Sequence, residues 1–320
     1  MMNGLVRKNL ITMKKFLYLG FFLVFTVSCN NNSKLAENLL KEAQTYYESQ
    51  EYANAKLYLD SLKLSFPKEA AIQKERLQLM RLIELKEYTR NLNYCDSMLI
   101  IYEAKADSLK KNFLFEKDKN YDEIGKYLLK QQKTENNLQK TYIRCHVNEY
   151  GELILESVYY GSNPINHTKI KVSSPTGEYT ETESIPRDGG LNYAFQDFGA
   201  VTEIVTYKKE KNGSVIQFIC DNHNGKLKVE YIGSKTYSTW LTPVEKNAVI
   251  RVNELATVLS DIDRLKKEIQ KAQSRIEYLK AKIPEREKHI NANKKITPCK
   301  CSDIQGITKN ISTQNRYIAV

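Results

Sequence analysis

A seven-residue repeat of apolar side chains runs through the last third of the chain. One repeat position holds Leu255, Ile262, Ile269, Ile276 and Ile283, and the position three residues later holds Val258, Leu265, Ala272 and Leu279. This spacing is typical of a coiled-coil seam and predicts one long helix over residues 243–290. Pro284 is expected to bend or end this helix.

Such a seam needs an apolar partner. Residues 103–140 contain no Pro and only one Gly, and their apolar residues recur at helical spacing, which predicts a second long helix. We expect the two helices to pair antiparallel within one chain, because a domain inserted between them brings their ends together at low loop entropy. The alternative is a homodimer through residues 255–283.

Helical spacing of apolar and small residues also covers residues 35–102, and part of this pattern occurs twice at a constant offset of 36 residues. The first copy contains Glu51, Tyr52, Tyr58, Asp60, Ser61 and Leu62, and the second contains Glu87, Tyr88, Tyr94, Asp96, Ser97 and Met98. The pattern resembles two tetratricopeptide repeats, each a helix-turn-helix unit.

This resemblance implies stacked hairpins with a surface that binds extended peptides or partner helices. The tyrosines expected to contact a partner are Tyr46, Tyr52, Tyr88 and Tyr94. The alternative is that two hairpins are too few for a groove and only brace the rest of the chain.

Residues 141–242 are richer in β-branched and aromatic residues, with turn residues at short intervals. Alternation predicts strands at residues 142–147, 153–159, 168–173, 178–183, 203–208, 214–220 and 226–231. Asn-Gly pairs between these runs are strong hairpin signals. We therefore predict an antiparallel sandwich or barrel of six to seven strands.

Together these elements predict the α+β class. The expected order is tetratricopeptide-like hairpins, then a long antiparallel helical stalk with the β domain inserted in it, and last a C-terminal tail over residues 291–320.

The net charge of +11 is unevenly distributed. Residues 263–300 hold twelve Lys or Arg against five Asp or Glu. Such a segment faces either an anionic surface or solvent along a helix. Beyond the N-terminus, no apolar run approaches the roughly 18 residues of a bilayer span.

The N-terminus has the layout of a secretory signal. Two lysines precede an apolar run over residues 16–25, and small residues then lead to a cysteine. The motif Thr26-Val27-Ser28-Cys29 resembles a bacterial lipobox, although Thr26 replaces the usual aliphatic residue. The alternative is an ordinary signal peptide with a coincidental cysteine.

The lipobox resemblance implies that residues 1–29 are a lipoprotein signal peptide, that Cys29 carries acyl chains, and that residues 30–34 form a polar tether. Translation starts at Met1 or at Met13. The residues after the cysteine favour an outer-membrane anchor facing the periplasm, with surface exposure as the alternative. An exported chain is not expected to bind nucleic acid.

Cys145 and Cys220 are both expected in the β core. In an oxidising compartment they form a disulfide, or they remain two buried thiols on distant strands. Cys95 is expected in the helical core.

The sequence offers no pattern typical of catalysis. The four histidines lack a nucleophile and an orienting acid at a recognisable spacing, and no phosphate-binding or hydrolase motif is present. Cys299 and Cys301 lie near His289, but no second cysteine pair completes a zinc site. We expect no metal, no cofactor and no enzymatic activity.

The whole chain resembles a Bacteroidetes-type tetratricopeptide-like lipoprotein. This resemblance implies a cell-envelope scaffold or protein-binding module with an unidentified envelope protein as its partner. One alternative is glycan or peptidoglycan binding through the β domain, with Tyr159, Tyr160 and Tyr193 as contacts. A second is a hydrolase whose site is assembled from distant residues.

Overall fold

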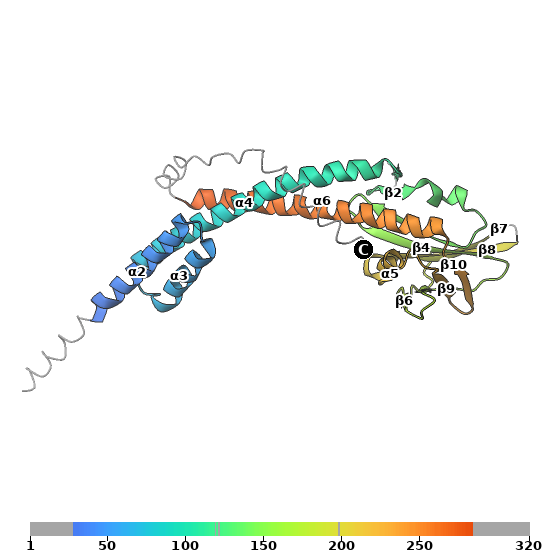
Figure 1. Cartoon of the computed structure of the whole chain (residues 1–320), viewed down its shortest axis with the longest axis horizontal. Coiled ribbons are helices and arrows are strands. Elements are labelled where there is room, and N and C mark those ends of the chain that lie inside the picture. Colours follow the sequence, from blue (N-terminus) through green and yellow to red (C-terminus); the bar gives the residue numbers. More distant parts are fainter. Residues whose placement is uncertain (1–27, 119, 121, 198, 284–320) are drawn as a thin grey trace, which may run out of the picture. The chain divides into compact units, whose positions relative to one another are not determined.

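The computed structural model describes residues 28–283, except residues 119, 121 and 198. The described helices longer than a turn are α2 (Ser28–Glu48), α3 (Tyr52–Ser65), α4 (Ala70–Lys110), α5 (Val215–Asp221) and α6 (Pro243–Lys282), and they accompany two antiparallel sheets (Figure 1). The predicted α+β class is therefore confirmed. None of the helices in this part of the chain combines the length and the hydropathy that a membrane span requires.

The described residues form two compact units. Unit 1 comprises residues 28–88 and 274–283, and unit 2 comprises residues 89–273. Helices α4 and α6 each contribute to both units, because their residues fall on both sides of these boundaries.

In unit 1, α2, α3 and the first part of α4 lie side by side (Figure 1). Their shared core consists of Ala36, Leu40, Ala43, Ala55, Leu59, Leu62, Ile72, Leu79 and Ile83. The alanines are fully buried, which allows the helices to approach closely. Gln50 forms the turn between α2 and α3 with a positive φ of 64°, so these two helices form one helical hairpin.

The predicted second hairpin is wrong, because α4 runs without a break through residues 70–110. The 36-residue offset would place its turn at Leu85, Lys86 and Glu87. These are good helix formers, and none of them favours the left-handed conformation that Gln50 adopts. The second copy of the pattern therefore lies along a single helix, and stacked tetratricopeptide-like hairpins are not confirmed.

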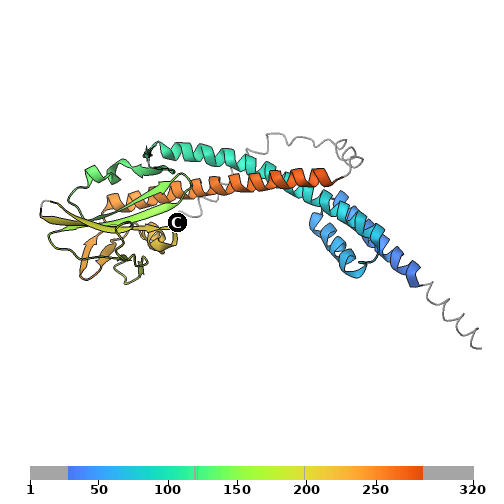
Figure 2. The ribbon, with the colours of Figure 1, turned by 180° about the vertical axis from the view of Figure 1, so that it is seen from behind.

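The long helix predicted over residues 243–290 is confirmed as far as Lys282, and residues 284–290 lie outside the described part. In unit 1, Arg275 pairs with Glu84 at 2.6 Å, and in unit 2, Lys266 pairs with Glu103 at 3.0 Å. The seam residues are buried, except the half-buried Ile269. Within each unit α6 thus lies antiparallel beside α4 (Figure 2).

The helix predicted over residues 103–140 is wrong beyond Lys110. Strands β1 (Phe113–Glu116) and β2 (Lys126–Leu129) follow, and then two short 3-10 helices. Phe115 pairs with Tyr127 across β1 and β2, and their rings lie 4.9 Å apart. These aromatic residues also fit a helical spacing, so periodicity alone could not exclude a hairpin.

Unit 2 contains both antiparallel sheets, and neither is closed, so a barrel is not confirmed. The six-stranded sheet has the order β1-β2-β3-β4-β8-β7, with β3 (Tyr142–Asn148), β4 (Leu153–Gly161), β7 (Asn192–Asp197) and β8 (Ala200–Lys208). The four-stranded sheet has the order β10-β9-β5-β6, with β5 (Lys169–Ser173), β6 (Tyr179–Glu181), β9 (Lys228–Ile232) and β10 (Thr236–Trp240).

A single apolar core joins the two sheets to α5, α6 and the end of α4. The strand predicted over residues 214–220 is wrong, because this segment is α5. Val215, Ile216 and Ile219 of α5 are buried at helical spacing, and this short apolar run fits either period.

Helix α6 packs closely on the turn between β3 and β4. Gly151 in this turn has φ +81°, and a Cβ atom added there would overlap the backbone N of Ser260 and the carbonyl O of Ala256. Gly177 has φ +93° but no atom within 4 Å of the same position. A side chain at either glycine would strain the backbone, but only a side chain at Gly151 would also clash with neighbouring atoms.

We predict that Gly151→Ala destabilises unit 2 more than Gly177→Ala does. Both variants place alanine in a left-handed conformation, which costs about 1 to 2 kcal/mol. Only Gly151→Ala must also displace the backbone of α6. Urea unfolding followed through Trp240, the single tryptophan of the chain, measures both, and equal losses would contradict this packing.

Candidate functional site

The predicted lipidation site, Cys29, lies in the first turn of α2. Residues 30–34 also belong to α2, so the structure has a helix where a tether was predicted. The rest of the predicted signal peptide, residues 1–27, lies outside the described residues, as do His289, Cys299 and Cys301.

The four tyrosines predicted to bind a partner do not share one unit. Tyr46 and Tyr52 are half-buried and pack on the core of unit 1, where Tyr46 stacks on Tyr58 with ring centroids 5.2 Å apart. Tyr88 is also half-buried in unit 1, whereas Tyr94 is 61% exposed and belongs to unit 2.

The two core cysteines are both free thiols in the structure. Cys145 is buried in β3, and Cys220 is half-buried in α5, with Asn253 Nδ2 3.8 Å from its Sγ atom. Burial raises the pKa of both thiols, so little of the reactive thiolate forms near neutral pH. Cys95 is buried, as expected.

The structure brings together a serine, a histidine and a glutamate that sequence analysis did not connect. Ser157 lies on β4, His167 precedes β5, and Glu203 lies on β8. Ser157 Oγ lies 2.8 Å from His167 Nε2, and His167 Nδ1 lies 2.9 Å from Glu203 Oε2. This is the order of contacts found in a nucleophile, base and acid triad.

The Glu203 carboxylate also holds the chain segment before β5. Its Oε1 atom accepts the backbone N–H groups of Ile165 and Asn166, each at 2.8 Å, and its Oε2 atom accepts the N–H of His167 at 2.9 Å. Burial acts to raise the pKa of Glu203, but the hydrogen bonds from His167 and these amides outweigh it and lower the pKa to about 2.

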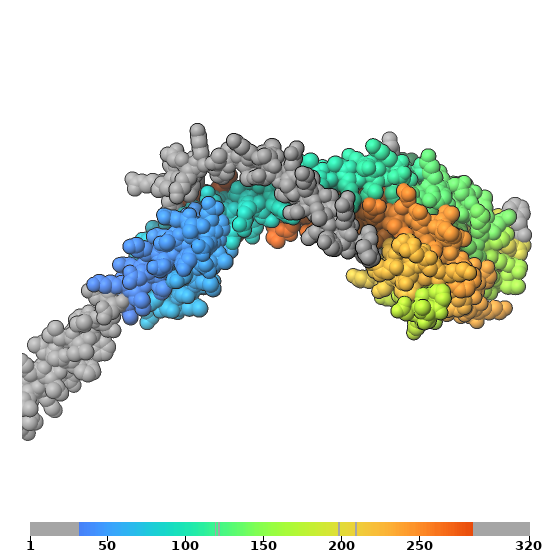
Figure 3. All heavy atoms as spheres, in the orientation of Figure 1, coloured from blue at the N-terminus to red at the C-terminus, as the bar shows by residue number. Residues whose placement is uncertain are grey.

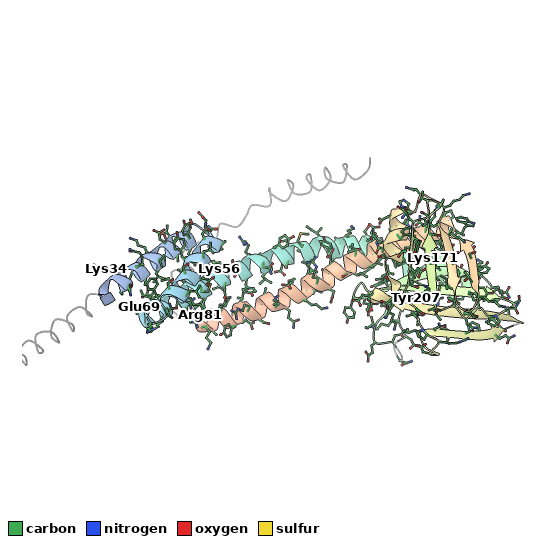
Figure 4. The ribbon with its side chains drawn as sticks, turned by 90° about the horizontal axis from the view of Figure 1, so that it is seen from below. Lys34, Lys56, Glu69, Arg81, Lys171 and Tyr207 are labelled. Carbon is green, nitrogen blue, oxygen red and sulfur yellow. The ribbon has the colours of Figure 1, made fainter. Side chains whose placement is uncertain are left out.

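From Ser157 the hydrogen bonds continue towards the four-stranded sheet. Ser157 Oγ lies 3.2 Å from the Tyr207 hydroxyl, whose pKa burial raises while the nearby Ser157 and Thr182 side chains lower it. Thr182 Oγ1 accepts the backbone N–H of Ile170 on β5 at 3.0 Å. We call Glu203, His167, Ser157, Tyr207 and Thr182 the buried polar chain; Figure 4 labels Tyr207 among the strands.

No member of the buried polar chain is open to solvent. Ser157 and Tyr207 are 0% exposed, His167 is 1%, Glu203 is 2% and Thr182 is 4%. A hydrolytic serine must lie about 3 Å from a substrate carbonyl that can reach it. In this conformation the buried polar chain can position strands, but it cannot meet a substrate.

The sequence did contain a signal for the buried polar chain. Ser157 alternates with Leu155 and Tyr159 on the core-facing side of β4, and Glu203 precedes Val205 at the same alternation on β8. A buried polar group requires hydrogen-bond partners, so a serine and a glutamate at core positions predict a network. Their partners are too distant in sequence to be identified from spacing.

Two cavities of unit 2 are open to solvent. The larger, of about 500 Å³, has Asn112, Gln131, Asn247 and Arg251 among its lining residues. The smaller, of about 100 Å³, contains the ion pair of Arg144 with Glu156. Neither cavity includes a member of the buried polar chain.

The smaller cavity also includes His146, which lies 3.9 Å from Glu156. Burial lowers the pKa of His146 to about 4. This imidazole is therefore neutral near pH 7, and the cavity holds no serine or reactive thiolate beside it.

No protein family, no curated protein and no solved structure matches the chain. Among the described residues, no group of three or more His, Cys, Asp or Glu is arranged to hold a metal ion.

We predict that Glu203→Gln lowers the free energy of unfolding at pH 7 by about 2 to 3 kcal/mol, because a charged acceptor of four hydrogen bonds is lost. The folded pKa of Glu203, about 2, lies below the unfolded value of about 4.3. The stabilisation is therefore present above about pH 4.3 and is lost as the pH falls towards 2.

Urea unfolding of the wild type and Glu203→Gln between pH 7 and pH 3 measures this difference, which should shrink over the acid part of the range. Glu178→Gln, at an exposed glutamate, is the matched control. Equal free energies of unfolding for the wild type and Glu203→Gln at pH 7 would show that the carboxylate does not stabilise the fold.

Proposed function

We propose that the protein is a lipid-anchored, non-catalytic scaffold or protein-binding module of the cell envelope. The observation that carries the non-catalytic part is the burial of Ser157, His167 and Glu203, whose hydrogen bonds join strands and whose nucleophile is 0% exposed. This favours a binding module over the hydrolase alternative.

The anchor part of the proposal rests on the lipobox-like motif that ends at Cys29. Each buried CH₂ of an acyl chain contributes roughly 0.8 kcal/mol, so several chains hold a protein firmly. Since α2 already includes residue 29, the helices of unit 1 would begin directly at the lipidated residue. The membrane proposed is the outer membrane, on its periplasmic face.

The tyrosines expected to stack on a sugar are too buried to do so, which favours a protein partner over a glycan. Tyr159 lies in the core of unit 2 and is 6% exposed, while Tyr160 and Tyr193 are half-buried. A sugar ring needs an open aromatic face, which Tyr159 does not offer. The homodimer through residues 255–283 is less favoured, because most of the seam residues are already buried within the chain.

We predict that Cys29→Ser abolishes incorporation of an alkyne-labelled palmitate and moves the protein from the membrane fraction to the soluble fraction. Cys220→Ser, at a half-buried thiol, should keep both the label and the membrane attachment. In-cell crosslinking of the anchored protein should then capture an abundant envelope protein. If the wild type incorporates no labelled palmitate, the proposed lipid anchor is wrong. If crosslinking captures only random neighbours, the proposed protein-binding function is wrong.

We also predict that a fluorophosphonate probe does not label the folded protein, because Ser157 Oγ is inaccessible. Wild type, Ser157→Ala and Ser61→Ala, the last at an exposed serine, should give the same background signal by gel fluorescence. Labelling of the wild type that disappears only in Ser157→Ala would overturn the non-catalytic proposal.

A further inference from the structure

Strand β10 is an exposed edge of the four-stranded sheet. It pairs with β9 on one side only, and four of its five residues are exposed, including Trp240 at 55% and Tyr237 at 39%. The visible surface of unit 2 in Figure 3 includes the region of this hairpin. An unpaired edge of this kind is a template for adding another strand.

The pairing between β9 and β10 determines which backbone groups point outwards. The N–H of Leu241 donates to the carbonyl of Leu227 at 2.8 Å. In an antiparallel ladder, residues alternate between hydrogen-bonded and non-hydrogen-bonded pairs. Thr239 and Tyr237 therefore bond β9, whereas the N–H and C=O groups of Thr236, Ser238 and Trp240 point away from the sheet.

The other edge strands of the two sheets offer fewer backbone groups that are free to pair with an added strand. Strand β6 has three residues, and the outermost strand β1 has four. On β7, Asn192 is already used, because its N–H donates to Asp188 and its carbonyl accepts the N–H groups of Asp188 and Gly189. Among the described edge strands, β10 thus presents three outward residues that are free to pair, whereas β7 presents only Ala194 and Gln196.

Natural edge strands are commonly protected by lysine, proline or a bulge. Strand β10 has none of these, since its sequence is Thr-Tyr-Ser-Thr-Trp and its register with β9 is continuous. The Tyr237 ring is supported from behind by Tyr159 and Tyr231, with centroids 5.3 Å and 6.1 Å away. The edge is therefore both unprotected and held in place.

The charges at the ends of β10 indicate the chemistry of the occupant. Lys235 directly precedes the strand, and Lys226 lies across the hairpin beyond its other end. Both lysines are exposed, and neither has an ion-pair partner among the described residues. The hairpin's one glutamate, Glu230, pairs instead with Lys228 at 2.7 Å.

We propose that β10 binds an extended segment of a partner protein as an added strand, with acidic residues of that segment beside Lys226 and Lys235. The segment would exchange backbone hydrogen bonds with Thr236, Ser238 and Trp240, which is the β-augmentation mode of peptide recognition. A second copy of this chain fits less well, because it would bring the same basic ends to the edge. The inference rests on the proposed binding function and names the surface and the class of partner.

The test uses the full chain in detergent and two synthetic peptides of alternating Thr and Val, one with Glu and one with Lys at both ends. Binding is followed by the emission of Trp240, the single tryptophan, and by hydrogen exchange of the β10 amides. The Glu-ended peptide should bind several-fold to about tenfold more tightly, the range expected from two exposed ion pairs. The amides of Ser238 and Trp240 should become protected.

Ser238→Pro removes an outward N–H without breaking the ladder to β9, and it should abolish peptide binding. Ser238→Ala keeps that N–H and should bind like the wild type. Because proline could disturb the strand itself, Lys226→Glu with Lys235→Glu provides a second arm, and this double variant should prefer the Lys-ended peptide.

Three results would overturn the inference: neither peptide binds, Ser238→Pro binds as well as Ser238→Ala, or the charge variant keeps the original preference. A monomer-to-dimer equilibrium that Ser238→Pro abolishes, without peptide binding, would identify a second copy as the occupant and also overturn it. In each case the proposed binding function stands or falls separately, through the in-cell crosslinking of the anchored protein.

Discussion

The arrangement of unit 2 depends on the hydrogen bonds that the buried carboxylate of Glu203 accepts. Removing a charge from water costs on the order of several kcal/mol, and the cost is offset only if the charge is fully hydrogen-bonded. Three backbone amides and the His167 ring supply those bonds. Glu203 lies on β8 of the six-stranded sheet, and the residues that it holds lead directly into β5 of the four-stranded sheet, so these bonds tie the two sheets together.

The segment that Glu203 holds also supports the exposed hairpin of β9 and β10. The carbonyl of Ile165 accepts the N–H of Lys235 at 3.3 Å and the Ser234 hydroxyl at 2.9 Å. Gly233 packs so closely on Ile165 and Asn166 that a side chain there would overlap their backbone. The buried charge of Glu203 thus holds the segment on which the turn between β9 and β10 rests.

Much of the fold could be predicted from the spacing of apolar residues, wherever that spacing fits either a helix or a strand but not both. The seven-residue repeat identified α6, and alternation identified β3, β4, β5, β8 and β9 close to their observed bounds. The failures fall where short apolar runs fit both periods, as in β1 and α5. The second helical hairpin failed for another reason: sequence similarity to the first copy was real, but its turn residues were helix formers, so α4 continued through them.

The candidate sites were less predictable than the fold. Cys29 and its motif are local in sequence and could be proposed directly. The buried polar chain could not, because His167 acquires its partners from β4 and β8, and only the three-dimensional pairing of the strands brings them together. The outward groups of β10 depend on which strand happens to lie at the edge, and residues 236–240 were not predicted as a strand at all.

The interaction that most needs testing is the set of hydrogen bonds that keeps the buried Glu203 carboxylate ionised. A ¹³C NMR titration of the glutamate side-chain carboxyls in the folded chain measures this directly. We expect Glu203 to stay ionised throughout the range in which other glutamates titrate, with a pKa of about 2. Titration of Glu203 near the ordinary value of about 4.3 would mean that these hydrogen bonds do not outweigh the effect of burial, and Glu203 would then not be the charge that holds unit 2 in place.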